Sequence, residues 1–152
     1  MIFITSAKKT GNDIENGRLN ISANIIVKNI GNLREMNRFK YFTDQELSGM
    51  VDDICYKLDR ARELFGHPIV ITSGYRTFEQ NFSIGGARNS AHLEGKAADI
   101  KAPIDAFQRE KLMWAFGAAG FKRVESAYRH IHVDIANDDL HPSPYFWQGD
   151  DK

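Results

Sequence analysis

Residues 130–135 read HIHVDI, a run in which polar and apolar side chains strictly alternate. Successive side chains of a β-strand point to opposite faces of a sheet, so this pattern predicts a half-buried strand. One face is apolar and is expected to pack on a core, through Ile131, Val133 and Ile135. The other face presents three groups that can bind a metal ion or a proton: His130, His132 and Asp134.

The segments around this run predict a mixture of helices and strands. Short strands are expected at 69–72 (IVIT, a buried strand), 96–102 (KAADIKA) and 121–126 (FKRVES), the last pairing with 128–135 as a hairpin. The glycines of 83–95 indicate a long irregular loop, and two prolines suggest an irregular tail over 137–152. Without regular βαβ alternation, this order indicates an α+β domain with a mainly antiparallel sheet.

Two helices are predicted, each with one apolar stripe. The first runs from Thr43, which has Glu46 at capping-box spacing, to Gly66. Its stripe comprises Leu47, Met50, Val51, Ile54, Leu58, Ala61 and Phe65, and Cys55 beside it is expected to be an inert packing thiol. The second runs over 104–120, with Pro103 in its first turn and Gly120 at its end. Its inward residues are expected to be Ile104, Phe107, Leu112 or Met113, and Phe116.

Composition is that of a soluble globular protein with one main domain. The 152 residues are 42% apolar and 26% charged, and 20 basic residues balance 20 acidic ones, so nothing predicts nucleic-acid binding. A single cysteine excludes an intramolecular disulfide, and no run is long enough to insert into a membrane. The start of the chain lacks signal-peptide features, which predicts a protein made and folded in the cytoplasm. Residues 1–37 are expected to form an extension of uncertain structure, with patterns typical of short strands at 2–4 and 21–30, before a domain at 38–152.

A metal site can be built from the loop after residue 89 and the strand HIHVDI. Zinc binds imidazole nitrogen and carboxylate oxygen, and catalytic zinc typically has three protein ligands and one water. His92, Asp99 and His132 would make such a set, with Gly95 relaxing the turn between the first two. Histidines on a strand face are also often merely exposed or hydrogen-bonded, so HIHVDI alone does not decide between these readings.

Several motifs together resemble a known family. Ser90, His92, Gly95, Ala97 and Asp99 are similar to the S-x-H-x-x-G-x-A-x-D signature of zinc D-alanyl-D-alanine carboxypeptidases and the related L-alanyl-D-glutamate endopeptidases of bacteria and phages. The resemblance covers roughly residues 38–148 and extends to SGYRT (73–77), NFSIGGARNSAH (81–92), GF (120–121) and HIHVD (130–134).

This resemblance implies an α+β metallopeptidase with the hedgehog/DD-peptidase fold, acting on peptidoglycan stem peptides. It implies Zn²⁺ bound by His92, Asp99 and His132, an oxyanion-stabilising Arg76 and a catalytic His130. Ser90 and Tyr75 are candidates for substrate binding, although Ser90 could instead cap a turn and Tyr75 could simply pack.

One position departs from the family pattern. The endopeptidase and dipeptidase branches have a glutamate general base three residues before the last histidine ligand, where this chain has Arg129. The base is therefore His130, Glu125 or Asp134, and Asp134 could alternatively orient a histidine or be solvated. Trp147 and its aromatic neighbours could cover the core or line a groove.

Two functions follow from the resemblance. The first is a zinc peptidase of the D-Ala-D-Ala carboxypeptidase type. The lack of a signal peptide favours a phage or prophage lysis enzyme that reaches the cell wall after release. The second is a catalytically silent zinc fold that binds cell wall or a protein. The sequence does not indicate which bond is cut or the oligomeric state.

Overall fold

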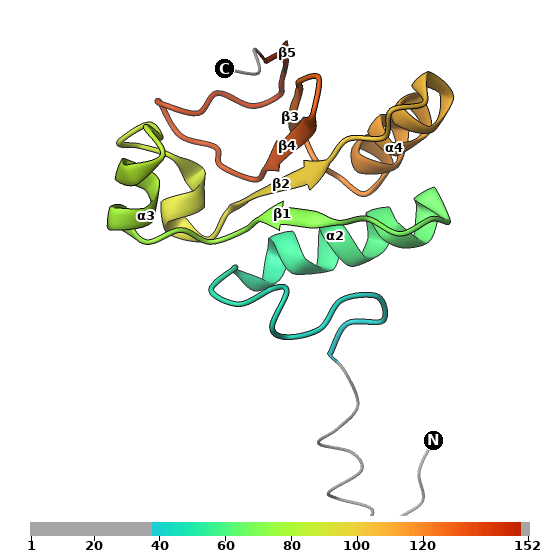
Figure 1. Ribbon diagram of the computed structural model, residues 1–152, viewed down its shortest axis with the longest axis horizontal. Helices are drawn as coiled ribbons and strands as arrows, with labels where there is room; N and C mark the ends of the chain where they lie inside the picture. The colour runs from blue at the N-terminus through green and yellow to red at the C-terminus, as the bar shows by residue number, and fades with distance from the viewer. Residues whose placement is uncertain (1–37, 150–152) are drawn as a thin grey trace, which may run out of the picture. The chain divides into compact units, whose positions relative to one another are not determined.

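The computed structural model describes residues 38–149, so the predictions for residues 1–37 lie outside the described part (Figure 1). The elements are α2 (Asp52–Phe65), β1 (Ile71–Ser73), α3 (Phe78–Ser83), a 3-10 turn η1 (Ala91–Glu94), β2 (Ala97–Lys101), α4 (Ala106–Ala118), β3 (Arg123–Ser126), β4 (His130–Asp134) and β5 (Tyr145–Gln148). The strands form one sheet in the order β1-β2-β4-β3-β5. All neighbours are antiparallel except β3 and β5, so the predicted α+β class is confirmed.

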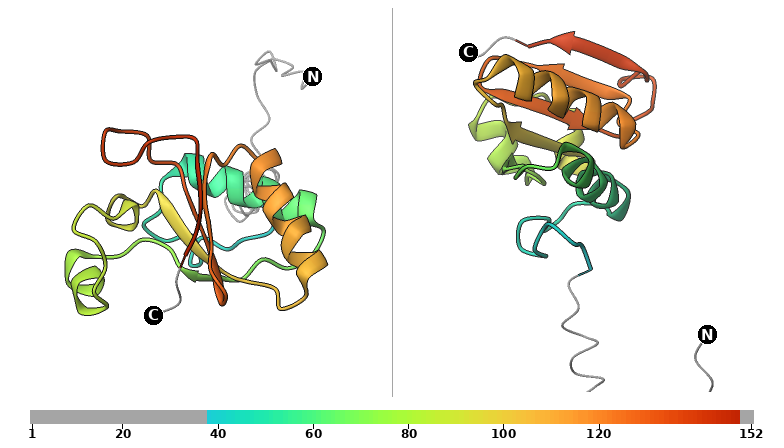
Figure 2. Two further views of the ribbon diagram at one scale, coloured as in Figure 1. Left: turned by 90° about the horizontal axis from the view of Figure 1, so that it is seen from above. Right: turned by 90° about the vertical axis from the view of Figure 1, so that its right-hand side faces the viewer.

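Helices α2 and α4 lie together against one face of the sheet (Figure 2). Their buried side chains join the apolar residues of the central strands in one core. The fully buried strand residues of this core are Ala98, Ile100, Val124, Ile131 and Val133. The alternation read in HIHVDI is therefore confirmed, because its apolar face packs under the helices. None of the helices in residues 38–149 is long and apolar enough to cross a membrane.

Helix α2 begins at Asp52, nine residues later than predicted from Thr43. Thr43 and Glu46 do bond reciprocally, with amide-to-side-chain distances of 2.9 and 3.3 Å, but they stabilise a separate turn. Gly49 ends that turn with φ +76°, a left-handed conformation that a helix cannot contain. A Cβ at Gly49 would lie only 2.5 Å from the Tyr75 ring, so close packing also requires glycine here. The predicted helix end at Gly66, with φ 78°, is confirmed.

Helix α4 begins at Ala106, where the side chain of Asp105 accepts a hydrogen bond from Gln108 N at 2.8 Å. Pro103 therefore precedes the helix instead of lying in its first turn. The predicted burial of Ile104 and Phe107 is wrong, because these side chains are 99% and 68% exposed. Nine residues separate Phe107 from the buried Phe116, which is about two and a half turns, so the two face opposite sides.

Two further predictions need correction, and one helix was not predicted. Residues 69–72 are not a fully buried strand, because β1 covers Ile71–Ser73 at the sheet edge and Val70 is half exposed. The segment after Arg76 contains α3, which begins at a capping box between Thr77 and Gln80. The tail is not wholly irregular, because β5 pairs in parallel with β3.

Candidate metal centre

The face of the sheet opposite the helices carries a row of polar side chains. Asp99 of β2 pairs with His132 of β4, and Ser73 of β1 pairs with Asp99 on the other side. Beyond His132, the row continues through Glu125 of β3 to Trp147 of β5. Because paired residues of neighbouring strands share a face, the pairing alone brings Asp99 and His132 together.

His92 reaches this row from η1, whose geometry is set at both ends. Ser90 is the N-cap, and its hydroxyl accepts a 3.4 Å hydrogen bond from the His92 amide. Gly95 ends the turn with φ +66°, and a Cβ there would lie 2.3 Å from the carbonyl oxygen of Gly49. The side chain of His92 is consequently held inside the protein, with the residue only 2% exposed.

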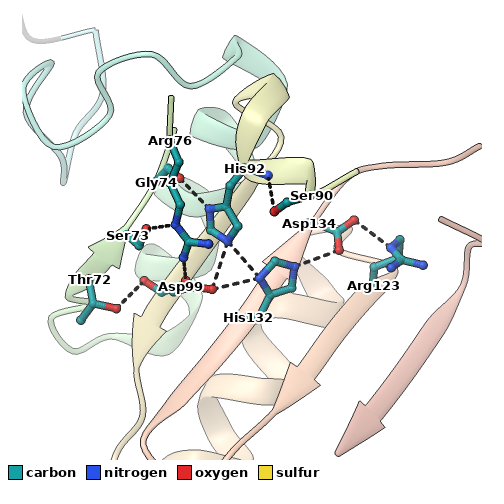
Figure 3. Close-up of polar contacts among 10 residues, drawn as sticks. All are labelled: Thr72, Ser73, Gly74, Arg76, Ser90, His92, Asp99, Arg123, His132 and Asp134. Atoms are coloured by element: carbon teal, nitrogen blue, oxygen red, sulfur yellow. Dashed lines mark hydrogen bonds and ion pairs between the residues drawn. The ribbon is translucent and has the colours of Figure 1, made fainter. Parts of the chain in front are cut away.

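The three predicted ligands converge on one point (Figure 3). Asp99 Oδ1 lies 3.2 Å from His92 Nε2 and 2.9 Å from His132 Nδ1, and the two nitrogens are 3.3 Å apart. Ligand atoms about 2.0–2.2 Å from a tetrahedral zinc ion are separated by roughly 3.3–3.6 Å, so the triangle is slightly smaller than that of a zinc-bound site and close to it in size. No fourth His, Cys, Asp or Glu joins the cluster in the described part of the chain.

Hydrogen bonds on the far side of each imidazole direct one nitrogen of each ring into this cluster. His92 Nδ1 lies 2.6 Å from the carbonyl oxygen of Gly74, which can only accept, so this nitrogen carries the proton and Nε2 keeps its lone pair. His132 Nε2 lies 3.0 Å from the carboxylate of Asp134, which leaves Nδ1 to bind a metal. Such outer partners are typical of metal-binding histidines, and the donor set fits a zinc ion.

Arg76 holds the second oxygen of the aspartate ligand. Its Nη2 donates to Asp99 Oδ2, and its Nε donates to Ser73 Oγ at 2.8 Å (Figure 3). The Arg76 amide also donates to the carbonyl oxygen of His92 at 3.1 Å. Arg76 is thus tied into the cluster and is not a solvated arginine at a strand end.

These contacts alter the proton affinities of the cluster. Burial favours the neutral form of Asp99, but the hydrogen bond from His132 outweighs it and holds the pKa of Asp99 far below its usual range. Burial also disfavours a charged His132, yet hydrogen bonds to Asp134 and Asp99 raise the pKa of His132 to about 9. Without a metal, the cluster therefore holds a proton where a cation would bind, and metal binding must displace that proton.

The remaining predicted site residues lie around the cluster. His130 is on the same face of β4, paired with Lys101, and stands outside the three-ligand group. Tyr75 is partly exposed, and its ring packs over Gly49. Ser90 caps η1, which is one of the two roles that the sequence predicted for it.

The two alternative carboxylates differ sharply in their surroundings. Asp134 is 2% exposed and accepts hydrogen bonds from His132, Arg123 and the Ala136 amide, so it is not solvated. Glu125 pairs with His132 across the sheet, but its carboxylate lies against Gly149, where a Cβ would come within 1.7 Å of Oε1.

Sequence reasoning missed Arg123, which is buried beside Asp134. The signal was available, because Arg123 and Glu125 alternate with Val124 in the predicted hairpin strand. It also missed the contact of Ser73 with Arg76, which depends on how the edge strand is placed. Trp147, left open between core and groove, lies with its ring centre 6.0 Å from that of His132.

Taken together, the fold and the cluster define an α+β protein with a candidate metal site of two histidines and one aspartate. The sequence matches the peptidase M15 family over residues 32–134, well over half of its length, and the chain belongs to this family. A 53-residue segment is 40% identical to the zinc D-Ala-D-Ala carboxypeptidase of Streptomyces albus G. That segment is 34% of this chain and 21% of the relative, so the match spans about a fifth of the relative's length.

Proposed function

We propose that this protein is a zinc-dependent peptidase that hydrolyses an amide bond in the stem peptides of peptidoglycan. The observation that carries the proposal is the triangle of His92 Nε2, Asp99 Oδ1 and His132 Nδ1, whose edges are close in length to those of a zinc site. Three protein ligands leave one coordination position for solvent, as in catalytic zinc sites. Membership of the peptidase M15 family and the partial likeness to a zinc carboxypeptidase support the same reaction.

The residues of the site would have the following roles in the reaction. His92, Asp99 and His132 would hold the zinc ion, which lowers the pKa of bound water to about 7 and polarises the substrate carbonyl. Arg76 fixes the Asp99 carboxylate and carries a permanent charge beside the site, suited to stabilising a developing oxyanion. His130, about 6.5–7 Å along β4 from His132 by strand rise, would accept or return a proton.

The finer assignment is a carboxypeptidase of the D-Ala-D-Ala type. It is supported by the named relative and by the H-x-H arrangement at 130–132, with Arg129 where the endopeptidase branch has its glutamate. We further propose that the protein is made in the cytoplasm and acts on the cell wall after release, as a phage or prophage lysis enzyme does. The competing function is a silent zinc fold that binds cell wall or a protein.

The test is to incubate purified protein with peptidoglycan and with a defined pentapeptide ending in D-Ala-D-Ala, and to identify the products by mass. We expect release of D-alanine from the pentapeptide, loss of this activity with a chelator and its return with Zn²⁺. An otherwise identical peptide with an amidated C-terminus separates the two peptidase types, because an endopeptidase does not need the free carboxylate.

A matched pair of variants makes this test specific to the site. His132→Ala should be inactive, whereas His67→Ala should retain parental activity because His67 lies outside the cluster and contacts the Phe65 ring. If the protein cleaves none of the stem peptides in a chelator-sensitive way, the proposal is contradicted and the binding function is favoured.

A further inference from the structure

Arg123 is a buried cation that contacts both the metal centre and the C-terminal strand. The residue is 8% exposed and lies on β3, where it pairs with Asp134 of β4 on one side and with Tyr145 of β5 on the other. Burying a guanidinium is costly unless it is well paired, so the partners of Arg123 indicate what it stabilises.

The first partner is the carboxylate that orients a proposed metal ligand. Arg123 Nε donates to Asp134 Oδ1 at 2.8 Å, and the Ala136 amide donates to the same oxygen at 3.0 Å. These two bonds fix the plane of the carboxylate and leave Oδ2 to meet His132 Nε2 at 3.0 Å. Asp134 therefore depends on Arg123 for the orientation in which it holds the imidazole (Figure 3).

The second set of partners belongs to the tail. Arg123 Nη1 donates to the carbonyl oxygen of Pro142, just before β5. Its guanidinium carbon lies 5.8 Å from the ring centre of Tyr145 and 5.3 Å from that of Trp147. Trp147 in turn lies beside the His132 ring. The guanidinium of Arg123 thus contacts both Asp134, which bonds the His132 imidazole, and Trp147 of β5, which lies beside the His132 ring.

From these contacts we infer that Arg123 is a positioning residue of the metal centre, which sets zinc affinity through Asp134 and His132 while it holds β5 beside the site. The inference rests on the proposed function, and it deepens that function by naming a residue that sets the affinity for zinc. Outer partners of metal-bound histidines typically change metal affinity 10- to 100-fold when removed. The planar fork of arginine suits this role, because its nitrogens bond in two directions while its face contacts the aromatic rings.

The test measures zinc affinity by competition with a chromophoric chelator in Arg123→Met, whose unbranched side chain replaces that of arginine as far as Nε and carries no charge. We expect zinc binding to weaken 10- to 100-fold. Arg109→Met is the matched control, because Arg109 also makes two hydrogen bonds of 2.6 Å, to the carbonyl oxygens of Ala127 and Tyr128 in the β3–β4 connection. Its zinc affinity should stay within about twofold of the parent. Circular dichroism at the assay temperature checks that each variant is folded.

A double-mutant cycle distinguishes positioning from a general loss of structure. If Arg123 acts through Asp134, Arg123→Met should weaken zinc binding no further once Asp134→Asn is present. Additive losses would overturn the inference, as would parental affinity in folded Arg123→Met or an equal loss in Arg109→Met.

Arg123→Lys covers the case in which the methionine variant does not fold. A lysine ammonium cannot bond Asp134 and Pro142 while it stacks on the rings, so zinc binding should weaken at least about threefold. Parental affinity in Arg123→Lys would overturn the inference. The peptide assay distinguishes the two claims. If the parent protein cleaves no peptide but the Arg123 variants bind zinc more weakly, only the proposed function is contradicted. If the parent protein cleaves the peptide but the Arg123 variants bind zinc with parental affinity, only this inference is contradicted.

Discussion

The two faces of strands β2 and β4 differ completely in what they contact. Toward the helices, Ile100, Ile131 and Val133 are fully buried among apolar side chains of the core. On the opposite face, Asp99 and His132 contact each other, His92 and two outer partners, Arg76 and Asp134. Neighbouring residues of one strand thus serve different ends. The face toward α2 and α4 (the helix face) supplies stability, and the opposite face (the open face) carries the candidate metal site. Substitutions one residue apart should therefore affect different properties.

The largest effect is expected from His132→Ala on the open face. Removing one of three ligands should abolish stoichiometric zinc binding and stem-peptide cleavage, exceeding the 10- to 100-fold typical of an outer partner. Zinc titration and the peptide assay measure the two losses, with His67→Ala as the control. Zinc bound at parental affinity by the variant would show that His132 is not a ligand.

His130→Ala, on the same face, should separate rate from binding. A residue that transfers a proton in the reaction contributes about 10²- to 10⁴-fold in rate, and we expect kcat to fall by that factor. Zinc affinity should remain within about twofold, because His130 lies outside the three-ligand cluster. Steady-state kinetics with matched zinc loading measures the change, and an unaltered kcat would remove His130 from the mechanism.

Ile131→Ala changes the residue between these two histidines, on the helix face. Truncating a fully buried isoleucine leaves a cavity, so the free energy of unfolding should fall by about 2–5 kcal/mol. Zinc affinity of the folded protein should be unchanged, since the side chain points away from the metal. Chemical denaturation of metal-free protein gives the first quantity, and weakened zinc binding with full stability would mean that the faces are not independent.

The smallest effect is expected from Phe107→Ser, outside both faces. The exposed Phe107 side chain buries little of its apolar surface in the folded protein, so the change in the free energy of unfolding should stay within about 0.5 kcal/mol. The same denaturation measurement on Phe116→Ser, at a fully buried position of α4, provides the contrast. A comparable loss in both variants would mean that Phe107 is packed after all.

The convergence of His92, Asp99 and His132 could be predicted from the sequence. Alternation in HIHVDI places the side chain of His132 on the polar face, and the motif from Ser90 to Asp99 contributes the other two residues through its resemblance to a known family. The errors arise where a contact with a residue distant in the sequence decides the local structure. Thr43 and Glu46 form their capping pair, but Gly49 packs against Tyr75 and ends the turn.

The position of the tail could not be predicted for the same reason. Strand β5 pairs with β3 across about twenty residues of sequence, and two prolines precede it. The role of Arg123 depends on that pairing and on the Pro142 carbonyl, so alternation places its side chain on a face without revealing its partners.

The most direct test of the metal centre is an anomalous difference map from crystals of the zinc-loaded protein, recorded on both sides of the zinc absorption edge. The geometry predicts a single strong peak bonded to His92 Nε2, a carboxylate oxygen of Asp99 and Nδ1 of His132, with solvent at the fourth position. An empty cluster in metal-replete crystals, bonding through Nε2 of His132, or a fourth side chain on the ion would contradict the account.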